Sequence, residues 1–261
     1  MTREEKQLLQ TLLITACDAY YGYRAPGFTR TRAFTDDTPH AAVHSTAADE
    51  PTTDISQPLQ AEKRPSLNSI AAQIATCTRC PLARTRTKTV PGMGREHPVV
   101  LVVGEGPGHD EDVQGLPFVG PAGKLLDKML SAINLDRRTN CYIANVVKCR
   151  PPHNRTPYPE ETAACGPFLA AQIQVLKPHM ILAAGRTAAH HLLATTAPLT
   201  RLRGRFFSYG DIPVLVTYHP SALLRDASLK RPTWEDLKLF RAHLLERVPD
   251  YASLQPAQDM P

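Results

Sequence analysis

The segment that most constrains the fold is a short apolar run that ends in a glycine-rich turn. Residues 98–103, PVVLVV, have the length and residue type of a buried strand. The next five residues, Gly104-Glu105-Gly106-Pro107-Gly108, cannot extend a strand, so the chain must turn there. Ligands of open α/β sheets bind beyond the carboxyl ends of the strands. The segment therefore predicts an α/β fold with a small-molecule pocket at this turn, although a turn of this kind also occurs without a site.

The turn does not favour a dinucleotide as the ligand. Its glycines read G-x-G-x-G, whereas the dinucleotide fingerprint is G-x-G-x-x-G, and Pro107 removes an amide that could face a phosphate. The turn is followed by polar residues 109–112 and by the apolar insert 116–119, which carries Phe118. A glycine-rich turn at the end of a strand, with carboxylates and an aromatic ring close behind it, is typical of a small-molecule pocket.

The rest of the folded region alternates between strand and helix patterns. Apolar runs predict four strands, and residues with helical spacing predict the helices that follow them. This order predicts a three-layer αβα sandwich with a four-stranded, mostly parallel sheet. The expected strands are 98–103, 141–147, 179–184 and 213–217, and the main helices are 121–133, 159–176, 186–193 and 233–248.

Four regions are expected along the chain. Residues 1–22 have the apolar spacing of an amphipathic helix, which could dock on the body or bind a protein partner. Residues 23–65 are rich in Thr, Ala, Pro, Asp and Ser and predict a disordered linker. The folded domain is expected at 66–250, and residues 251–261 are expected to form a loose tail.

Composition and charge exclude a membrane protein and weakly favour a polyanionic partner. The chain has 42% hydrophobic residues, enough for one core, but no apolar run of about 18 residues. It opens on MTREEKQLLQ, which lacks the apolar core of a signal peptide, so an intracellular location is expected. Residues 1–65 carry a net charge of −2 and the remainder +7, which suits nucleic acid but which solubility explains equally well.

Four of the six cysteines form a candidate metal site. Cys77 and Cys80 make a C-x2-C pair, while Cys149 and Cys165 flank a proline-rich loop that can bring them together. Disulfides are the less expected use in an intracellular chain. The spacing suits either zinc or an iron–sulfur cluster, and the C-x2-C pair alone could also be a redox pair. Cys141 lies within an expected strand and is assigned to the core.

Several motifs in this order resemble the iron–sulfur (family 4) uracil-DNA glycosylases. The matching segments lie within about residues 67–247 and are CTRCPL, VGEGPGHDEDVQGLPFVGPAGKLLDKML, YIANVVKCRPPHNRTPYPEETAACGPFLAAQI and YHPSALLR. The resemblance implies a 4Fe–4S cluster on Cys77, Cys80, Cys149 and Cys165. It also implies hydrolysis of the N-glycosidic bond of uracil in single- or double-stranded DNA, as the first step of base excision repair. We accordingly expect a cytoplasmic, nucleoid-associated monomer.

The resemblance also implies how three residues recognise and release the base. A uracil in a duplex must be flipped out before an enzyme can reach it. Phe118 would stack on the flipped base, and Asn145 would accept from uracil N3–H and donate to O4. His219 would stabilise the negative charge that develops on O2 as uracil departs.

Other roles in the turn and in the last motif are less defined. Leu223 is the expected wedge that fills the base stack after flipping, with core packing as the alternative. Backbone amides of Gly106 and Gly108 are expected to contact uracil or the adjacent phosphate. Glu105 and Glu111 are both candidates for orienting water, and Glu111 could instead crowd uracil C5 and exclude thymine.

Two other functions are compatible with the residues. One is a non-enzymatic iron–sulfur protein that binds DNA, and the other is a glycosylase for another deaminated base, hypoxanthine or xanthine. The basic residues expected to contact phosphates in any of these cases are Arg84, Arg150, Arg155, Arg203 and Arg225.

Overall fold

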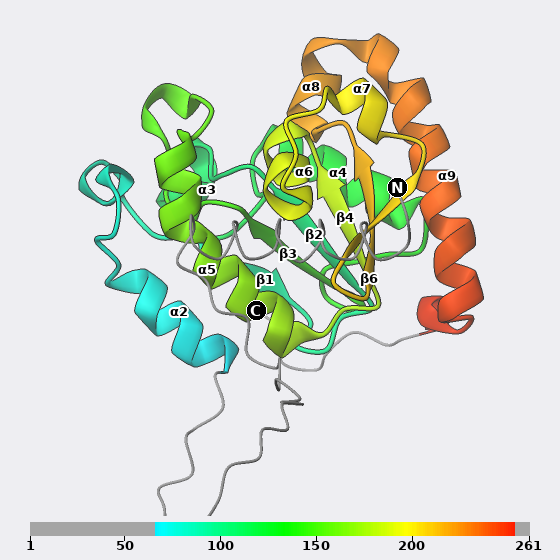
Figure 1. The fold of residues 1–261 in the computed structure, drawn as a ribbon, viewed down its shortest axis with the longest axis horizontal. Coiled ribbons are helices and arrows are strands. Elements are labelled where there is room, and N and C mark those ends of the chain that lie inside the picture. The colour runs from blue at the N-terminus through cyan, green and yellow to red at the C-terminus, as the bar shows by residue number, and fades with distance from the viewer. Residues whose placement is uncertain (1–65, 254–261) are drawn as a thin grey trace, which may run out of the picture. The chain divides into compact units, whose positions relative to one another are not determined.

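The computed structural model describes residues 66–253, which form an α/β domain (Figure 1). The expected helix at 1–22, the linker at 23–65 and most of the tail lie outside the described residues. Among residues 66–253, no helix combines the length and the apolarity needed to cross a membrane.

A six-stranded mixed sheet forms the middle layer, with strand order β1-β3-β2-β4-β6-β5. The four central strands run parallel, and the two outer strands pair antiparallel with their neighbours. Three of the central strands are completely buried, as expected of a parallel sheet with helices on both faces. The strands are β1 (Met93–Gly94), β2 (Val100–Gly104), β3 (Cys141–Asn145), β4 (Met180–Ala184), β5 (Phe206–Tyr209) and β6 (Ile212–Thr217).

The four-stranded sheet of the sequence prediction is therefore correct for the centre and incomplete at both edges. Strand β1 has only two residues, one of them glycine, so it has no detectable period. Strand β5 is absent from the sequence prediction because its four residues are partly exposed and follow a charged segment. It forms a hairpin with β6 through the turn at Gly210 and Asp211. Short edge strands are common because they limit edge-to-edge association.

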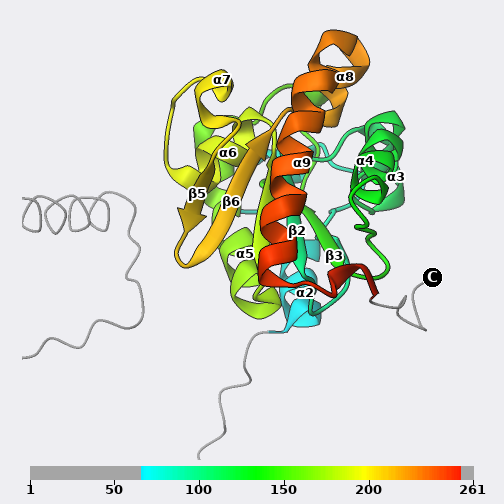
Figure 2. The same ribbon diagram turned by 90° about the vertical axis from the view of Figure 1, so that its right-hand side faces the viewer.

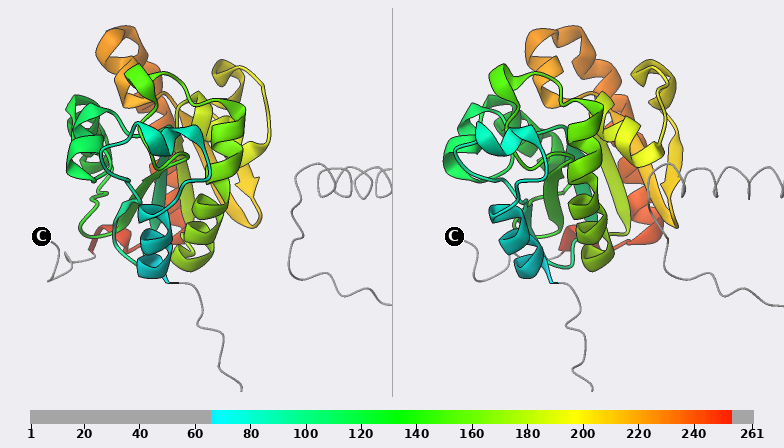
Figure 3. Two further views of the ribbon diagram at one scale, coloured as in Figure 1. Left: turned by 90° about the vertical axis from the view of Figure 1, so that its left-hand side faces the viewer. Right: turned by 60° about the vertical axis from the view of Figure 1, so that its left-hand side comes forward.

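Helices cover both faces of the sheet (Figures 2 and 3). Leu101 and Val103 on β2 pack in the core beneath α2, α5 and α6, whereas Val100 and Val102 pack in the opposite core beneath α4 and α9. This alternation is the period of two of a strand, and it confirms the three-layer arrangement. The helices of four or more residues, 3-10 turns aside, are α2 (Leu67–Ala75), α3 (His109–Gln114), α4 (Pro121–Ser131), α5 (Pro159–Leu176), α6 (Arg186–Leu193), α7 (Leu199–Leu202), α8 (Pro220–Arg225) and α9 (Lys230–Arg247).

Two segments differ from the sequence prediction. No helix was predicted at residues 109–114, which form the short helix α3 with Gly115 as its C-cap. The tail begins later than expected, because Tyr251 is fully buried and starts a 3-10 turn, Tyr251–Ser253. Its hydroxyl donates to the Ile133 carbonyl at 2.6 Å. One large aromatic side chain thus fixes the end of the domain.

Candidate active site

The candidate site lies at the C-terminal ends of the parallel strands. Gly104 and Asn145 are register partners at the ends of β2 and β3, and His219 follows the end of β6. Phe118 comes from the loop between α3 and α4. The topology therefore brings together three of the residues that the sequence singled out, from positions separated by about a hundred residues of chain.

The side chain of Asn145 is buried and has an unpaired oxygen. The residue is 2% exposed, and Oδ1 is the one buried side-chain oxygen or nitrogen among residues 66–253 that lacks a hydrogen-bond partner. An unpaired buried acceptor costs about 1–3 kcal/mol, so it persists where a ligand supplies the missing donor. This atom is therefore placed to accept an N–H from a bound molecule.

An aromatic ring and the unpaired amide meet above Gly104. A Cβ at Gly104 would stand 2.5 Å from both Asn145 Oδ1 and Phe118 Cζ, so glycine is needed for this close approach. Phe118 has a φ of 53°, a left-handed conformation that a bulky residue adopts at a cost of about 1–3 kcal/mol. Its ring centroid lies 5.5 Å from that of His219. The ring is thus held in a strained position between two polar side chains.

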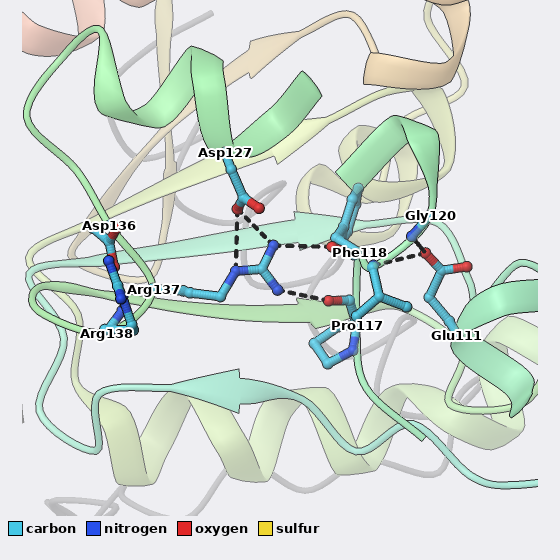
Figure 4. Close-up of polar contacts among 9 residues, drawn as sticks. Glu111, Pro117, Phe118, Gly120, Asp127, Asp136, Arg137 and Arg138 are labelled. Carbon is cyan, nitrogen blue, oxygen red and sulfur yellow. Dashed lines mark hydrogen bonds and ion pairs between the residues drawn. The ribbon is translucent and has the colours of Figure 1, made fainter. Parts of the chain in front are cut away.

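Arg137 and Glu111 fix the backbone around Phe118 (Figure 4). The Arg137 guanidinium donates to the carbonyl oxygens of Pro117 at 2.8 Å and Phe118 at 3.0 Å. It also pairs with Asp127 at 2.6 Å. From the other side, Glu111 Oε1 accepts from the amides of Val119 at 2.9 Å and Gly120 at 3.0 Å. These contacts hold the loop backbone from both sides, and they offset the cost of the left-handed backbone conformation of Phe118.

The environment of His219 keeps its ring neutral. Burial, assisted by the charge of Arg225 and opposed by that of Glu111, lowers the pKa of His219 to about 4. The backbone N–H of Ser221 donates to Nδ1 at 3.2 Å, and the Ser221 hydroxyl lies 2.8 Å from the same nitrogen. Because Nδ1 accepts, the neutral ring carries its proton on Nε2. His219 is therefore a neutral donor through Nε2.

The two candidate carboxylates have different surroundings. Glu111 is buried, and its Oε2 accepts from the Gly108 amide at 3.0 Å, so its carboxylate holds three backbone amides in total. Gly108 therefore donates inside the protein and not to a ligand. Glu105 is half-buried, and one of its oxygens accepts a short hydrogen bond from the hydroxyl of Thr187 on α6. Of the two, Glu105 has the freer carboxylate.

Leu223, the expected wedge, lies in the core. It is 3% exposed and packs with the residues beneath α4 and α9, whereas the next residue, Leu224, is 53% exposed. Helix α8 turns Leu223 inward because its side chain lies on the face that contacts α4. The alternative of core packing is therefore correct for Leu223, and Leu224 is the surface leucine of this motif.

The arginines expected to contact phosphate fall into two groups. Arg155 forms a bidentate pair with buried Glu161, and Arg203 pairs with buried Asp236 and stacks on Tyr218. These two stabilise the fold. Arg84, Arg150 and Arg225 are exposed or half-exposed, and Arg150 donates to Asn154 Oδ1 at 2.7 Å and approaches His109. The last group remains available to DNA.

The four cysteines of the candidate metal site line one cavity. The cavity lined by Cys77, Cys80, Cys149 and Cys165 is small and partly open to solvent. Two N–H donors face them: the Arg86 guanidinium donates to Cys149 Sγ at 3.1 Å, and the backbone N–H of Lys148 donates to Cys165 Sγ at 3.3 Å. The expected convergence of these thiols on one space is thus present, while Cys141 is buried elsewhere, in β3.

The described residues contain no preformed site for a single metal ion. Within residues 66–253, no three Cys, His, Asp or Glu side chains are arranged to hold one metal ion. A tetrahedral zinc site would need sulfurs about 4 Å apart, because each Zn–S bond is about 2.3 Å. Burial raises the pKa of the Cys165 thiol to about 11 and also raises that of Cys149. A metal group would have to displace these protons, so its binding releases protons.

Comparison with known proteins agrees with this geometry. Residues 91–238 match the Uracil DNA glycosylase superfamily. The type-4 uracil-DNA glycosylase of Thermotoga maritima is 46% identical over 173 residues, which cover 65% of this chain and 90% of that protein. The chain belongs to the type-4 uracil-DNA glycosylases. The enzymes of that name from Archaeoglobus fulgidus (41% identity, 66% of this chain, 90% of the relative) and Pyrobaculum aerophilum (40%, 70% and 97%) are similar to it to the same degree.

Membership of the type-4 family confirms the resemblance read from the motifs. Sequence reasoning nevertheless missed three residues of this type-4 domain, namely Arg137, Lys148 and Leu224. Nothing distinguishes Arg137 from Arg138 in the sequence. Lys148 carried a usable signal, because it follows a buried strand and directly precedes a candidate ligand, where a charged residue is unusual.

We predict that Arg137→Met will slow base release without weakening DNA binding. The change frees the Pro117 and Phe118 carbonyls and leaves Asp127 unpaired, which should lower the unfolding free energy by about 1–3 kcal/mol. A looser Phe118 should lower kcat roughly 10-fold. Arg138→Met is the matched control, since this neighbour is exposed and pairs only with Asp136. Equal kcat values in the two variants would refute the role of Arg137.

Proposed function

We propose that this protein removes uracil from DNA by hydrolysing the bond between uracil N1 and the deoxyribose C1′. The observation that carries the proposal is the unpaired, buried Oδ1 of Asn145 beside the Phe118 ring. The membership of the type-4 uracil-DNA glycosylases supports it. The product is free uracil and an abasic site, which other enzymes of base excision repair would process.

Asn145 supplies the specificity for uracil over cytosine. Its Oδ1 accepts from uracil N3–H while its Nδ2 donates to O4, and cytosine presents the reverse pattern at the same two positions. A site with buried polar groups rejects the mismatched base because those groups would remain unpaired. Phe118 adds stacking worth about 1–3 kcal/mol, which holds the ring without choosing it.

His219 and Glu105 act on the two sides of the breaking bond. As the C1′–N1 bond breaks, its electron pair moves to uracil, and Nε2–H of neutral His219 donates to the negative O2. Glu105 orients a water molecule, whose oxygen bonds to C1′ of the oxocarbenium-like sugar. One water proton leaves to solvent through the Glu105 carboxylate, and uracil takes up a proton after release. Thr187 fixes the Glu105 carboxylate in this role.

Cys77, Cys80, Cys149 and Cys165 would hold the 4Fe–4S cluster. Bound by four thiolates, it would supply a cross-link between the helix α2 region and the loop after β3, since hydrolysis needs no electron transfer. Its ligands Cys149 and Cys165 bracket the loop that carries Arg150. The cysteines therefore hold a DNA-contacting loop in place.

The exposed side of the site would contact DNA. Arg84, Arg150 and Arg225 would bind phosphates, which orient the duplex or single strand without reading its sequence. Leu224, on the exposed side of α8, is the leucine that could enter the base stack when uracil is flipped. The cytoplasmic nucleoid is where such an enzyme meets its substrate.

Hypoxanthine is a second candidate substrate, because its hydrogen-bonding edge fits the amide of Asn145. Hypoxanthine presents N1–H beside O6, the same donor and acceptor pair that uracil offers to Asn145. It is a larger ring, so the space around Phe118 decides whether it is accepted. Hypoxanthine therefore belongs in the same assay as uracil.

The proposal is tested by a cleavage assay on labelled oligonucleotides. Anaerobically purified protein is mixed with strands that carry one uracil, cytosine, thymine, hypoxanthine or xanthine, and abasic sites are broken with alkali. We expect cleavage at uracil, lowered by about 100-fold or more in Asn145→Ala. The matched control is Asn68→Ala, an exposed asparagine on α2, which should cleave as the wild type does.

Two results would overturn the proposal. Absence of uracil cleavage by brown, iron-containing protein that still binds DNA would indicate a non-enzymatic DNA-binding protein. Faster cleavage at hypoxanthine or xanthine than at uracil would indicate a glycosylase for another deaminated base.

A further inference from the structure

Lys148 is a buried cation that contacts the residue proposed to read uracil. It is 1% exposed, and its Nζ donates to the backbone carbonyl of Asn145 at 2.8 Å and to Gln172 Oε1 at 2.7 Å. Gln172 is itself fixed, because its Nε2 donates to the Pro91 carbonyl at 2.8 Å. The ammonium is therefore held between the end of β3 and helix α5.

The same residue lines the cavity of the four cysteines. Its backbone N–H donates to Cys165 Sγ at 3.3 Å, and the next residue is Cys149. No carboxylate within residues 66–253 forms an ion pair with Lys148. An uncompensated buried charge is costly, and the sulfur atoms of the cavity are the adjacent groups that become anionic when they bind a metal group.

We infer that Lys148 is a positioning residue that fixes Asn145 relative to the cysteine cavity. Its side chain holds the Asn145 backbone, and its own backbone is tied to the ligand Cys165. The amide of Asn145 can accept from N3–H and donate to O4 only if its plane is held, and the Lys148 contact removes freedom at that point of the chain. The inference deepens the proposed function and rests on it.

The inference gives the cysteine site a role in specificity. The ends of β3 and α5 are held from one side by the cysteine ligands and from the other by Lys148 and Gln172. A disturbance at Cys165 would therefore be transmitted to Asn145 through Lys148. Lys148 touches no substrate, so it acts only through the amide that it positions.

The test is a double-mutant cycle on base discrimination in binding. The probes are oligonucleotides with one 2′-fluoro-2′-deoxyuridine or 2′-fluoro-2′-deoxycytidine, whose 2′-fluorine makes the glycosidic bond resistant to hydrolysis. We expect Lys148→Met to lower the preference for uracil over cytosine by roughly 10-fold to 100-fold, with iron content unchanged. In the Asn145→Ala background the same change should have less than about a twofold effect, because coupled residues are not additive. Lys238→Met on α9 is the control for loss of an exposed lysine.

Each alternative outcome has a defined meaning. Equal losses from Lys148→Met in both backgrounds, or no loss in a folded variant, would overturn the inference. Should Lys148→Met fail to fold, Gln172→Leu keeps the lysine and removes its second acceptor. A several-fold loss of preference is then expected, and wild-type preference would overturn the inference.

The same measurements separate this inference from the proposed function. Wild-type protein that prefers uracil in binding but does not cleave it would refute the proposed function. The double-mutant cycle on binding would still decide the role of Lys148. Cleavage at uracil with an additive cycle would refute the inference alone. Wild-type protein that neither cleaves nor prefers uracil would refute both.

Discussion

His219→Ala is expected to lower kcat for uracil release by about 100- to 1000-fold, with the KM for DNA nearly unchanged. The lost group is an Nε2–H donor that acts on O2 only as negative charge develops there, so the ground state hardly feels its loss. Steady-state cleavage of a uracil oligonucleotide measures kcat and KM, and single-turnover cleavage isolates the chemical step. His243→Ala is the matched control, because this histidine stacks on Phe206 away from the site.

The pH dependence provides an independent check on the neutral form of His219. Burial lowers the pKa of His219 from 6.5 to about 4, so the ring stays neutral from pH 8 down to about pH 5. The unfolded chain takes up this proton first, so the contribution to stability is lost as the pH falls from about 6.5 towards 4. The melting temperature of the wild type should fall over this range more steeply than that of His219→Gln. A wild-type rate that titrates with a histidine-like pKa near 6.5, absent in the variant, would contradict the neutral donor.

Cys149→Ser is expected to cause the largest loss of stability. It removes one of four ligands, so iron content should fall and the unfolding free energy should decrease by about 4 kcal/mol or more. The loop that carries Arg150 would then be released, and affinity for DNA should fall with it. Iron analysis, thermal unfolding and DNA binding measure the three effects.

Cys141→Ala is the matched control for this change. Cys141 is equally buried, but it lies in β3 outside the cysteine cavity, so the variant should keep its iron and its DNA affinity. Full stability and DNA affinity in Cys149→Ser would show that the cysteine site does not hold the loop. Loss of iron from both Cys149→Ser and Cys141→Ala would show that iron is lost through disturbed core packing and not through loss of a ligand.

Much of the fold and part of the site followed from local patterns. The four central strands are apolar runs that end in glycine or a polar residue, and this signal depends only on neighbours in the sequence. Asn145 and His219 stand at or just after strand ends, where a parallel sheet collects its functional residues. Phe118 lies in the loop between α3 and α4, and it was selected through the motifs that resemble the family. The edge strands β1 and β5 could not be predicted, because two to four partly exposed residues show almost no alternation of apolar and polar side chains.

The roles of charged and apolar side chains near the site depended on contacts that no pattern contains. Glu105 and Glu111 are acids of the same short segment, but only Glu111 holds three backbone amides. Arg137 and Arg138 are neighbours, yet one fixes Phe118 and the other is solvated. Leu223 and Leu224 differ by one step along a helix, which turns one into the core and the other towards solvent.

The sequence by itself determined the α/β class and the family, because strand patterns and the order of motifs are properties of the chain itself. The cysteine set and the three residues of the base site are predictions from those motifs. Only the tertiary structure decided which carboxylate is free, which leucine is exposed and how Lys148 connects Asn145 to the cysteines. Those assignments depend on which donors and acceptors are already paired across the fold. Pairing of that kind joins residues distant in sequence, and its energy exists only after the chain has folded.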